Sequence, residues 1–306
     1  MASQKDIKDR ISSVKNIRKI TRAMEMVAAA RLRRAEARIE ELRPYAEAIR
    51  KMTRRAVEGA SGLPDIPILR EHDSIDNVGI LLLTGDRGLA GAFNSQIIRA
   101  GNRRRPEIEE EDNASVRWYA SGRRGVSSVQ FRGMELSGGY TGFTERPSYS
   151  DARNIADDLI AAYTDGELDR VEMFYNGYIS PMTQEVRHET LLPLQQADVL
   201  GDDEDEDSGG EGDSDTPDHS RALWIFEPDP EEILKRLAPD YVEISIYRAL
   251  LESSASELGA RMTAMRSASD NAAELIDDLT LEANRQRQAD ITQEIMEVVA
   301  GAEGLR

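Results

Sequence analysis

The sequence contains no cysteine, which excludes a disulfide framework, a thiolate nucleophile and a cysteine metal site. It has no run of 18 apolar residues, and its first residues are polar, so we expect neither a membrane span nor a signal peptide. Aromatic residues make up only 5% of the chain while charged residues make up 31%. This balance favours long helices with much surface over one large globule, although 40% hydrophobic residues suffice for a core.

Charge is spread unevenly along the 306 residues. The net charge of -18 would argue against a nucleic-acid partner only if it were evenly spread, and we expect no such partner. Residues 1–58 nevertheless hold sixteen Lys and Arg against eight Asp and Glu, whereas residues 202–218 hold ten acids. The average charge therefore hides a basic N-terminal region and a strongly acidic internal segment.

Both ends of the chain have the spacing of long amphipathic helices. In residues 1–58 and 228–306, apolar residues recur in steps of three or four with charges between them. They include Ile7, Ile11, Val14, Ile20, Met24, Val27 and Leu32 in the first range, and Leu258, Met262, Leu275, Leu279, Ile291, Ile295 and Val298 in the second. Because a narrow apolar stripe cannot stabilise a helix alone, we expect the two ends to pair as an antiparallel coiled coil.

Three residues within these helices are expected to disturb them. Pro44 removes an interior hydrogen bond and should kink the first helix or mark a joint near Arg43. Pro239 and Gly259 are the weak points of the second helix. The methionines at helical spacing are interpreted as core residues, with an adaptable sliding surface as the alternative; they are Met24, Met26, Met262 and Met265.

The middle of the chain, residues 75–200, has the pattern of an inserted α/β (Rossmann-like) domain. Residues 78–83 read as a buried strand, followed by a glycine-rich turn and a helical stretch near 95–98. Further strands are predicted at 116–120, 171–175 and 185–191, with a helix at 151–163. The predicted fold class is therefore α/β plus long helices.

Residues 201–220 form an acidic stretch that has almost no apolar side chain. Such a segment repels itself, so we interpret it as a disordered loop without a dedicated ligand. Calcium binding is the alternative, but the glycine and the terminal glutamate of an EF-hand loop are not at the required positions.

The turn at Gly85–Gly91 follows a strand and precedes a helix, the context in which glycine-rich loops bind phosphate. It lacks the Gly-Lys-Ser/Thr ending of a phosphate loop and has a different glycine spacing from the dinucleotide fingerprint. His72, His188 and His219 are too far apart in sequence to suggest a metal motif. We therefore expect turn glycines rather than a phosphate site, and no catalytic residue, cofactor or metal.

Two segments resemble the signatures of the gamma subunits of F-type ATP synthases. They are residues 20–33, Ile-Thr-Arg-Ala-Met-Glu-Met-Val-Ala-Ala-Ala-Arg-Leu-Arg, and residues 291–302, Ile-Thr-Gln-Glu-Ile-Met-Glu-Val-Val-Ala-Gly-Ala. The turn at residues 85–91 and the segment 227–230 also resemble that family, and Gly304 departs from its C-terminal pattern. The resemblance covers nearly the whole chain except the acidic stretch.

The resemblance implies a rotor shaft that turns inside a ring of alpha and beta subunits and couples proton flow at the membrane c-ring to ATP synthesis. The implied partners are the alpha, beta and epsilon subunits and the c-ring, with no nucleotide bound by this chain itself. Matching positions imply contacts to the stator ring by Met24, Arg31, Arg33, Arg34, Arg287, Gln288, Thr292 and Glu294, and a foot near the c-ring at Phe226 and Glu227.

Two alternatives remain open at this point: an α/β enzyme that uses the turn at Gly85–Gly91, and a passive coiled-coil scaffold. Under the rotor hypothesis the chain is a non-catalytic subunit. The absence of a transit peptide and of regulatory cysteines favours the cytoplasmic face of a bacterial plasma membrane, where the chain would be a peripheral membrane protein.

Overall fold

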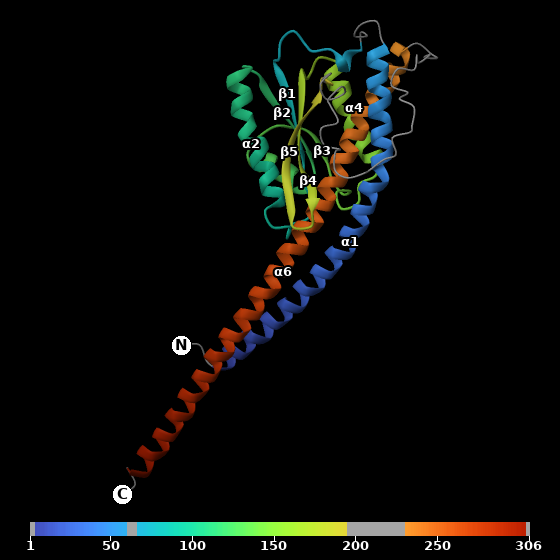
Figure 1. Ribbon diagram of the computed structural model, residues 1–306. Coiled ribbons are helices and arrows are strands. Elements are labelled where there is room, and N and C mark those ends of the chain that lie inside the picture. Colours follow the sequence, from blue (N-terminus) through green and yellow to red (C-terminus); the bar gives the residue numbers. More distant parts are fainter. Residues whose placement is uncertain (1–3, 60–65, 195–229, 304–306) are drawn as a thin grey trace, which may run out of the picture. The chain divides into compact units, whose positions relative to one another are not determined.

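The computed structural model describes residues 4–59, 66–194 and 230–303 (Figure 1). These residues belong to two compact units. Unit 1 takes residues up to Arg33, the short stretch Leu89–Gly91 and residues from Leu258 onward, and unit 2 takes the rest. The division falls inside both long helices, α1 (Gln4–Gly59) and α6 (Pro230–Glu303), which the sequence-based domain bounds keep whole.

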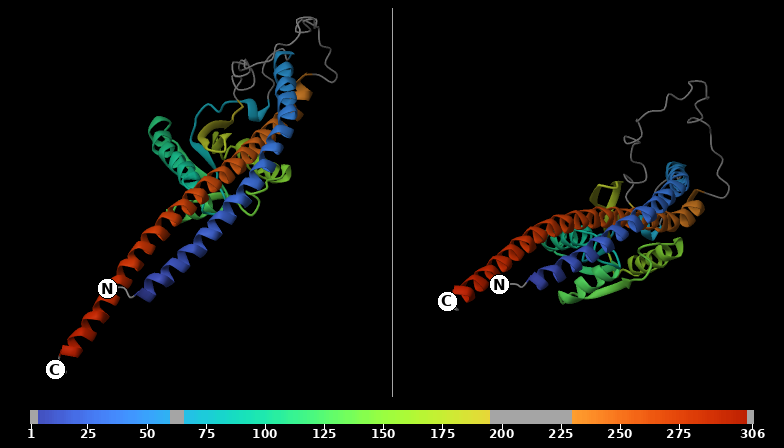
Figure 2. Two further views of the ribbon diagram at one scale, coloured as in Figure 1. Left: turned by 60° about the horizontal axis from the view of Figure 1, so that its bottom comes forward. Right: turned by 90° about the horizontal axis from the view of Figure 1, so that it is seen from below.

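In unit 1, α1 and α6 lie side by side and run in opposite directions (Figures 1 and 2). Four buried residues of α1 recur every seven positions, at Ile7, Val14, Thr21 and Ala28, and Leu32 follows one turn later. In α6 they recur in steps of three and four, at Met265, Ser269, Ala272, Ile276, Leu279 and Ala283. A seven-residue repeat keeps one seam facing the partner helix, and Ile7 and Val14 pack in one cluster with Ala272 to Ala283. The predicted antiparallel coiled coil is confirmed.

The two helices of unit 1 carry opposite charge. Residues 4–33 hold nine Lys and Arg against three Asp and Glu, whereas residues 258–303 hold four against nine. Charges that flank a coiled-coil seam set the choice of partner and its orientation, while small seam residues such as Ala28 and Ala272 let the helices approach closely. Electrostatic complementarity therefore adds to a seam that buries little apolar surface.

Unit 2 is built around a five-stranded sheet with the order β3-β2-β1-β4-β5. Its elements are η1 (Pro67–Leu69), β1 (Asn77–Leu83), α2 (Phe93–Glu111), β2 (Ser115–Ser121), α3 (Arg123–Phe131), β3 (Leu136–Tyr140), α4 (Tyr149–Thr164), β4 (Arg170–Ser180) and β5 (Thr183–Leu192). Strands β1 to β4 are parallel, and β5 runs antiparallel to β4. Strand β1 has β2 on one side and β4 on the other, and the chain goes from β1 to β2 before it returns to β4. The order of the strands therefore reverses between β1 and β4, which is a topological switch point.

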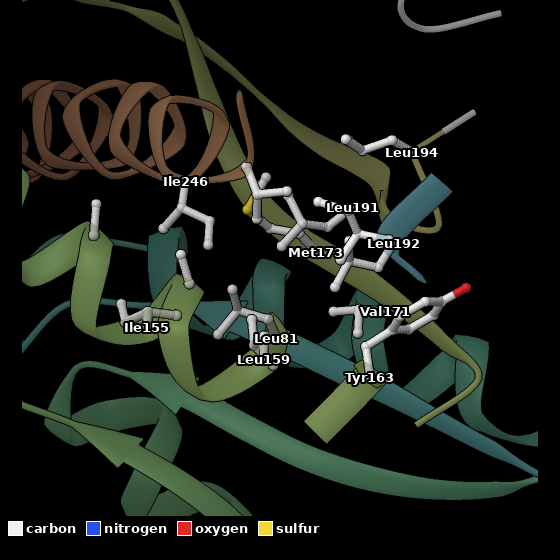
Figure 3. Packing of buried hydrophobic residues seen from close by; sticks show 14 of the residues in the cluster. Leu81, Ile155, Leu159, Tyr163, Val171, Met173, Leu191, Leu192, Leu194 and Ile246 are labelled. Carbon is white, nitrogen blue, oxygen red and sulfur yellow. The ribbon is translucent and has the colours of Figure 1, made fainter. Parts of the chain in front are cut away.

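Both faces of β1 are covered, which explains its continuous apolar run. Successive strand residues point to opposite faces. Leu82 and Ile80 face α2, where a Cβ on Gly101 would lie 2.6 Å from Leu82 Cδ2. Leu81 belongs to the opposite core, with side chains of β4, β5, α4 and α6 such as Ile246 (Figure 3). A parallel strand buried on both faces reads as an uninterrupted hydrophobic stretch.

All four predicted strands and the two predicted helices of this domain are present, as β1, β2, β4, β5, α2 and α4. The sequence did not predict α3 or β3. Helix α3 has only nine residues, follows a glycine with φ of 88°, and is too short to show a clear period. Strand β3 contains Gly138 and Gly139 and alternates only weakly, so its pairing with β2 defines it as a strand.

The long helices run unbroken through the three residues that were expected to disturb them, and one methionine expected in the core is exposed. Helix α1 continues through Pro44, and α6 continues through Pro239 and Gly259. Pro44 is exposed, so water can solvate the carbonyl group that loses its donor, and no joint forms at Arg43. Met265 is a core residue, as expected, but Met26 is 61% exposed because it lies off the seven-residue seam.

Candidate functional site

The turn after β1 uses its own polar groups internally. The Gly85 N–H donates to Asn94 Oδ1 at 2.8 Å, and the Asp86 N–H donates to Thr144 Oγ1 at 2.9 Å. The Asp86 carboxylate in turn accepts from the N–H of Arg123, the first residue of α3, at 3.1 Å. An acid at a helix N-terminus satisfies donors that a phosphate would otherwise bind. These groups therefore hold the turn together.

A carboxylate of α6 occupies the remaining space at this turn. A Cβ placed on Gly85 would lie 2.7 Å from the carboxyl carbon of Glu257, which is buried. The carboxyl ends of β1 and β4 are where open α/β sheets bind ligands, because the chain switches direction there. A buried carboxylate at this position would repel a phosphate group, so the geometry argues against a nucleotide site.

A buried ion cluster lies on the face of the sheet toward α2. Glu172 of β4 is 2% exposed, and its carboxylate accepts from Arg104 Nε at 3.1 Å and lies 2.8 Å from His188 Nε2. Burial alone would raise the pKa of Glu172, but hydrogen bonds and charge from His188 and Arg104 outweigh it and lower the pKa to about 2. The cluster joins α2, β4 and β5, and its groups are paired with one another.

His72 has a similar structural place beside the amino ends of β1 and β4. Its Nδ1 lies 2.6 Å from Asp169 Oδ1, and its ring stacks on Tyr163. Asp169 Oδ2 accepts from the N–H groups of Asp76 and Asn77, which lead into β1. Burial would raise the pKa of Asp169, but these hydrogen bonds lower it. His219 lies outside the described residues.

Unit 1 carries an apolar face on α1 that the coiled-coil seam does not use. Ile17, Ile20 and Val27 are each more than half exposed, and Met24 is half-buried. Residues at positions 17, 20, 24 and 27 share one helix face. We call these four residues the outer stripe. Aligned apolar side chains exposed to water indicate a surface that another protein covers.

The C-terminal turns of α6 carry a second exposed surface in unit 1. The buried pattern of α6 becomes partial at Gln286 and Asp290, and every residue from Ile291 to Val298 is exposed. We call residues 287–298 the tail segment. Its apolar members, Ile291, Ile295, Met296 and Val298, are 47–73% exposed. The sequence pattern had suggested a buried stripe here, but α6 continues past the point where α1 begins, so no seam covers it (Figure 2).

The stator-contact candidates divide between these surfaces. Arg287, Gln288, Thr292 and Glu294 are exposed in the tail segment, and Thr292 Oγ1 donates to the Gln288 carbonyl at 2.8 Å. Met24 belongs to the outer stripe, and Arg31 and Arg33 are exposed further along α1 in unit 1. Arg34 is exposed but belongs to unit 2. Phe226, Glu227 and the acidic stretch 201–220 lie outside the described residues.

Comparison with known proteins gives a consistent result. The profile of the ATP synthase family matches residues 3–305. The ATP synthase gamma chain of Rubrobacter xylanophilus is 43% identical over 305 residues, which cover 100% of this chain and 99% of the relative. The chain belongs to the ATP synthase gamma chain family. The gamma chain of Synechococcus sp. is 41% identical over 320 residues, with 100% of both chains covered.

Solved structures agree with this assignment. A chain of the central stalk and c-ring of Tetrahymena thermophila mitochondrial ATP synthase is 26% identical to this gamma chain, with a TM-score of 0.58 over 82% of this chain and 99% of that one. A chain of the Euglena gracilis mitochondrial enzyme, from its OSCP/F1/c-ring part, has a TM-score of 0.67 at 16% identity, over 99% and 94% of the two chains, and shows the shared fold. Within the described ranges, no helix of this gamma chain is long and apolar enough to cross a bilayer.

Proposed function

We propose that this gamma chain is the central-stalk rotor subunit of a proton-translocating ATP synthase. It carries torque between the membrane c-ring and the catalytic alpha/beta hexamer and so couples proton flow to ATP synthesis. The nucleotides belong to the partner subunits, and the chain is non-catalytic on its own. In this role it is a peripheral protein at the cytoplasmic face of a bacterial plasma membrane.

The observation that carries this proposal is the exposed apolar surface of unit 1. The outer stripe and the tail segment present aligned apolar side chains that neither α1 nor α6 covers. A passive two-helix scaffold needs only its inner seam to be apolar. Further apolar surface beside exposed Arg31, Arg33 and Arg287 fits a shaft enclosed by other subunits.

The charge difference between the helices suggests how one shaft acts on several identical subunits. In unit 1, α1 is basic and α6 is acidic, so the coiled coil presents different faces in different directions. Each catalytic subunit would contact a different face at any moment. A subunit conformation changes only by as much as its contact free energy differs between states, so an asymmetric shaft can favour a different state in each subunit.

Further partners follow from the same role. The α/β domain in unit 2 would contact the epsilon subunit and the c-ring, with Phe226 and Glu227 at the foot. The enzyme alternative is not favoured, because the turn at Gly85 uses its donors internally and holds the Glu257 carboxylate. A passive scaffold remains an outcome of the experiment below.

The test changes two neutral residues of the tail segment in the assembled complex. We expect Gln288→Ala combined with Thr292→Ala to leave assembly with alpha and beta subunits intact and to slow steady-state ATP turnover about tenfold, equivalent to about 1.4 kcal/mol in a barrier. Both side chains are exposed, so helix stability should depend little on them, while polar contacts to a partner, such as a hydrogen bond from the Gln288 amide to a carboxylate, would be lost.

The matched control is Gln130→Ala, which removes an exposed glutamine from α3 in unit 2. Its complex should turn over at the wild-type rate. If the double variant assembles fully and turns over ATP at the wild-type rate, Gln288 and Thr292 do not take part in coupling. Purification of the chain with unrelated partners, and without alpha and beta subunits, would instead support the scaffold.

A further inference from the structure

Helix α6 is most deeply enclosed where its sequence is polar. Every residue from Ala249 to Glu257 is buried, so water is excluded from the whole circumference of the helix over more than two turns. Five of the last six residues of this stretch are serine or glutamate. A buried polar group needs a hydrogen-bond partner, because leaving it unpaired costs about 1–3 kcal/mol. The partners of these side chains therefore show how this part of α6 is attached to the sheet of unit 2.

Two of the serines bond to the main chain of neighbouring parallel strands. Ser253 Oγ donates to the carbonyl of Leu83, the last residue of β1, at 3.1 Å. Ser256 Oγ donates to the carbonyl of Asn176 in β4 at 3.0 Å. A serine inside a helix commonly bonds to a carbonyl of its own preceding turn. Here both hydroxyls reach the backbone of the central strands of the sheet instead.

Charged groups of α6 extend the same attachment along the helix. The Glu257 carboxylate lies against the Gly85 turn, one residue after the serine that bonds to β4. Two turns earlier, Arg248 Nη2 donates to Glu189 of β5 at 2.7 Å, and Nη1 donates to Glu252 at 3.4 Å. Polar side chains of α6 therefore contact β1, β4 and β5.

We propose that Ser253, Ser256 and Glu257 form the joint through which torque passes between α6 and the α/β domain. This inference rests on the proposed rotor function and names positioning residues for it. Apolar contacts are non-directional, so by themselves they fix the rotation of a helix about its axis less sharply than hydrogen bonds do. Hydrogen bonds to main-chain carbonyls are directional and end on strands that the sheet holds rigid. The joint therefore resists rotation of α6 against the sheet.

The test measures coupling in membrane vesicles that carry the complete ATP synthase with this gamma chain. The variant is Ser253→Ala combined with Ser256→Ala, which removes both hydroxyls and little volume. We expect protons pumped per ATP hydrolysed to fall roughly threefold, within the range by which residues of a coupling network act. The chain should still assemble at normal stoichiometry. The control Ser127→Ala removes an exposed hydroxyl from α3 and should leave the ratio unchanged.

Each outcome decides the inference. An unchanged ratio in the double variant, or an equal fall in the Ser127 control, would overturn it. If the double variant does not assemble, Ser253→Ala alone is measured and read in the same way. A purely structural role would lower the melting temperature and the amount of complex without changing the ratio. If the wild-type complex itself shows no ATP-driven pumping, the proposed function fails. If wild type and double variant pump the same number of protons per ATP, only the proposed joint is refuted.

Discussion

Helix α6 has two different environments along one continuous backbone. In unit 1, between Met265 and Ala283, it buries one residue in every three or four, and the other residues are half-buried or exposed. In unit 2, residues 249–257 are buried all round, although this stretch is rich in serine and glutamate. The comparison teaches that the most enclosed part of a helix need not be its most apolar part, provided that its polar groups find partners.

The units also hold their charges differently. In unit 1 the charges of α1 and α6 lie mostly at the surface, where opposite sign favours pairing but salt screens it. In unit 2 the Glu172 carboxylate is buried with Arg104, Arg170 and His188 around it. Breaking a buried cluster leaves an uncompensated charge, so unit 2 depends more strongly on each partner.

The largest effect that separates the units should come from matched leucine changes. Leu81 has no exposed surface in the unit 2 core, whereas Leu279 lies in the two-helix seam of unit 1 with water on either side. We expect Leu81→Ala to lower the free energy of unfolding by about 3–5 kcal/mol and Leu279→Ala by about 2–3 kcal/mol. Urea unfolding followed by circular dichroism measures both. Equal losses would show that the seam is as enclosed as the sheet core.

A smaller effect should appear as a pH dependence that belongs to unit 2. The pKa of Glu172 is lowered to about 2 from its ordinary value of 4.5, so its contribution to stability is present above pH 4.5 and is lost as pH falls toward 2. Discounted for solvent screening, the contribution is about 1–2 kcal/mol. The free energy of unfolding, measured between pH 5 and 2, should therefore depend less on pH in Glu172→Gln than in the wild type. Identical pH profiles for the two proteins would refute this assignment.

The smallest effect is expected from the acidic stretch that links β5 to α6. A segment with ten acids and almost no apolar side chain contributes little to the core of either unit. Replacing residues 202–218 with a short Gly-Ser linker should leave the melting temperature of the chain nearly unchanged. A large drop, measured by calorimetry, would mean that the stretch makes stabilising contacts with one of the units.

Much of the candidate site could be predicted from the sequence, partly from the spacing of apolar residues and partly from the resemblance to a known family. Spacing alone predicted the coiled coil, and the resemblance to the gamma family identified Gln288 and Thr292 as contact candidates. Three residues of the outer stripe, Ile20, Met24 and Val27, were placed in the apolar pattern of the coiled coil, because they also follow steps of three and four. The available signal was the stricter seven-residue repeat of Ile7, Val14, Thr21 and Ala28, which separates seam from surface.

The joint at Ser253 and Ser256 had a weaker signal. A run of small polar residues inside an apolar helical pattern predicts that something unusual occurs there, but it does not identify a partner. Those partners, Leu83 and Asn176, lie 170 and 80 residues away in the sequence. Local pattern cannot specify such contacts, because they depend on the crossing of α6 over two neighbouring parallel strands.

The sequence by itself determined the long helices, the buried strands of the α/β domain and the separation of basic from acidic regions, because these follow from the spacing and sign of neighbouring residues. Only the tertiary structure decided which apolar residues of α1 face α6 and from which residue onward α6 is no longer packed against α1. It also decided that the Glu257 side chain lies beside Gly85. The physical reason is that burial and pairing belong to surfaces brought together by folding, so the same helical period can serve a seam, a solvent face or an enclosed joint.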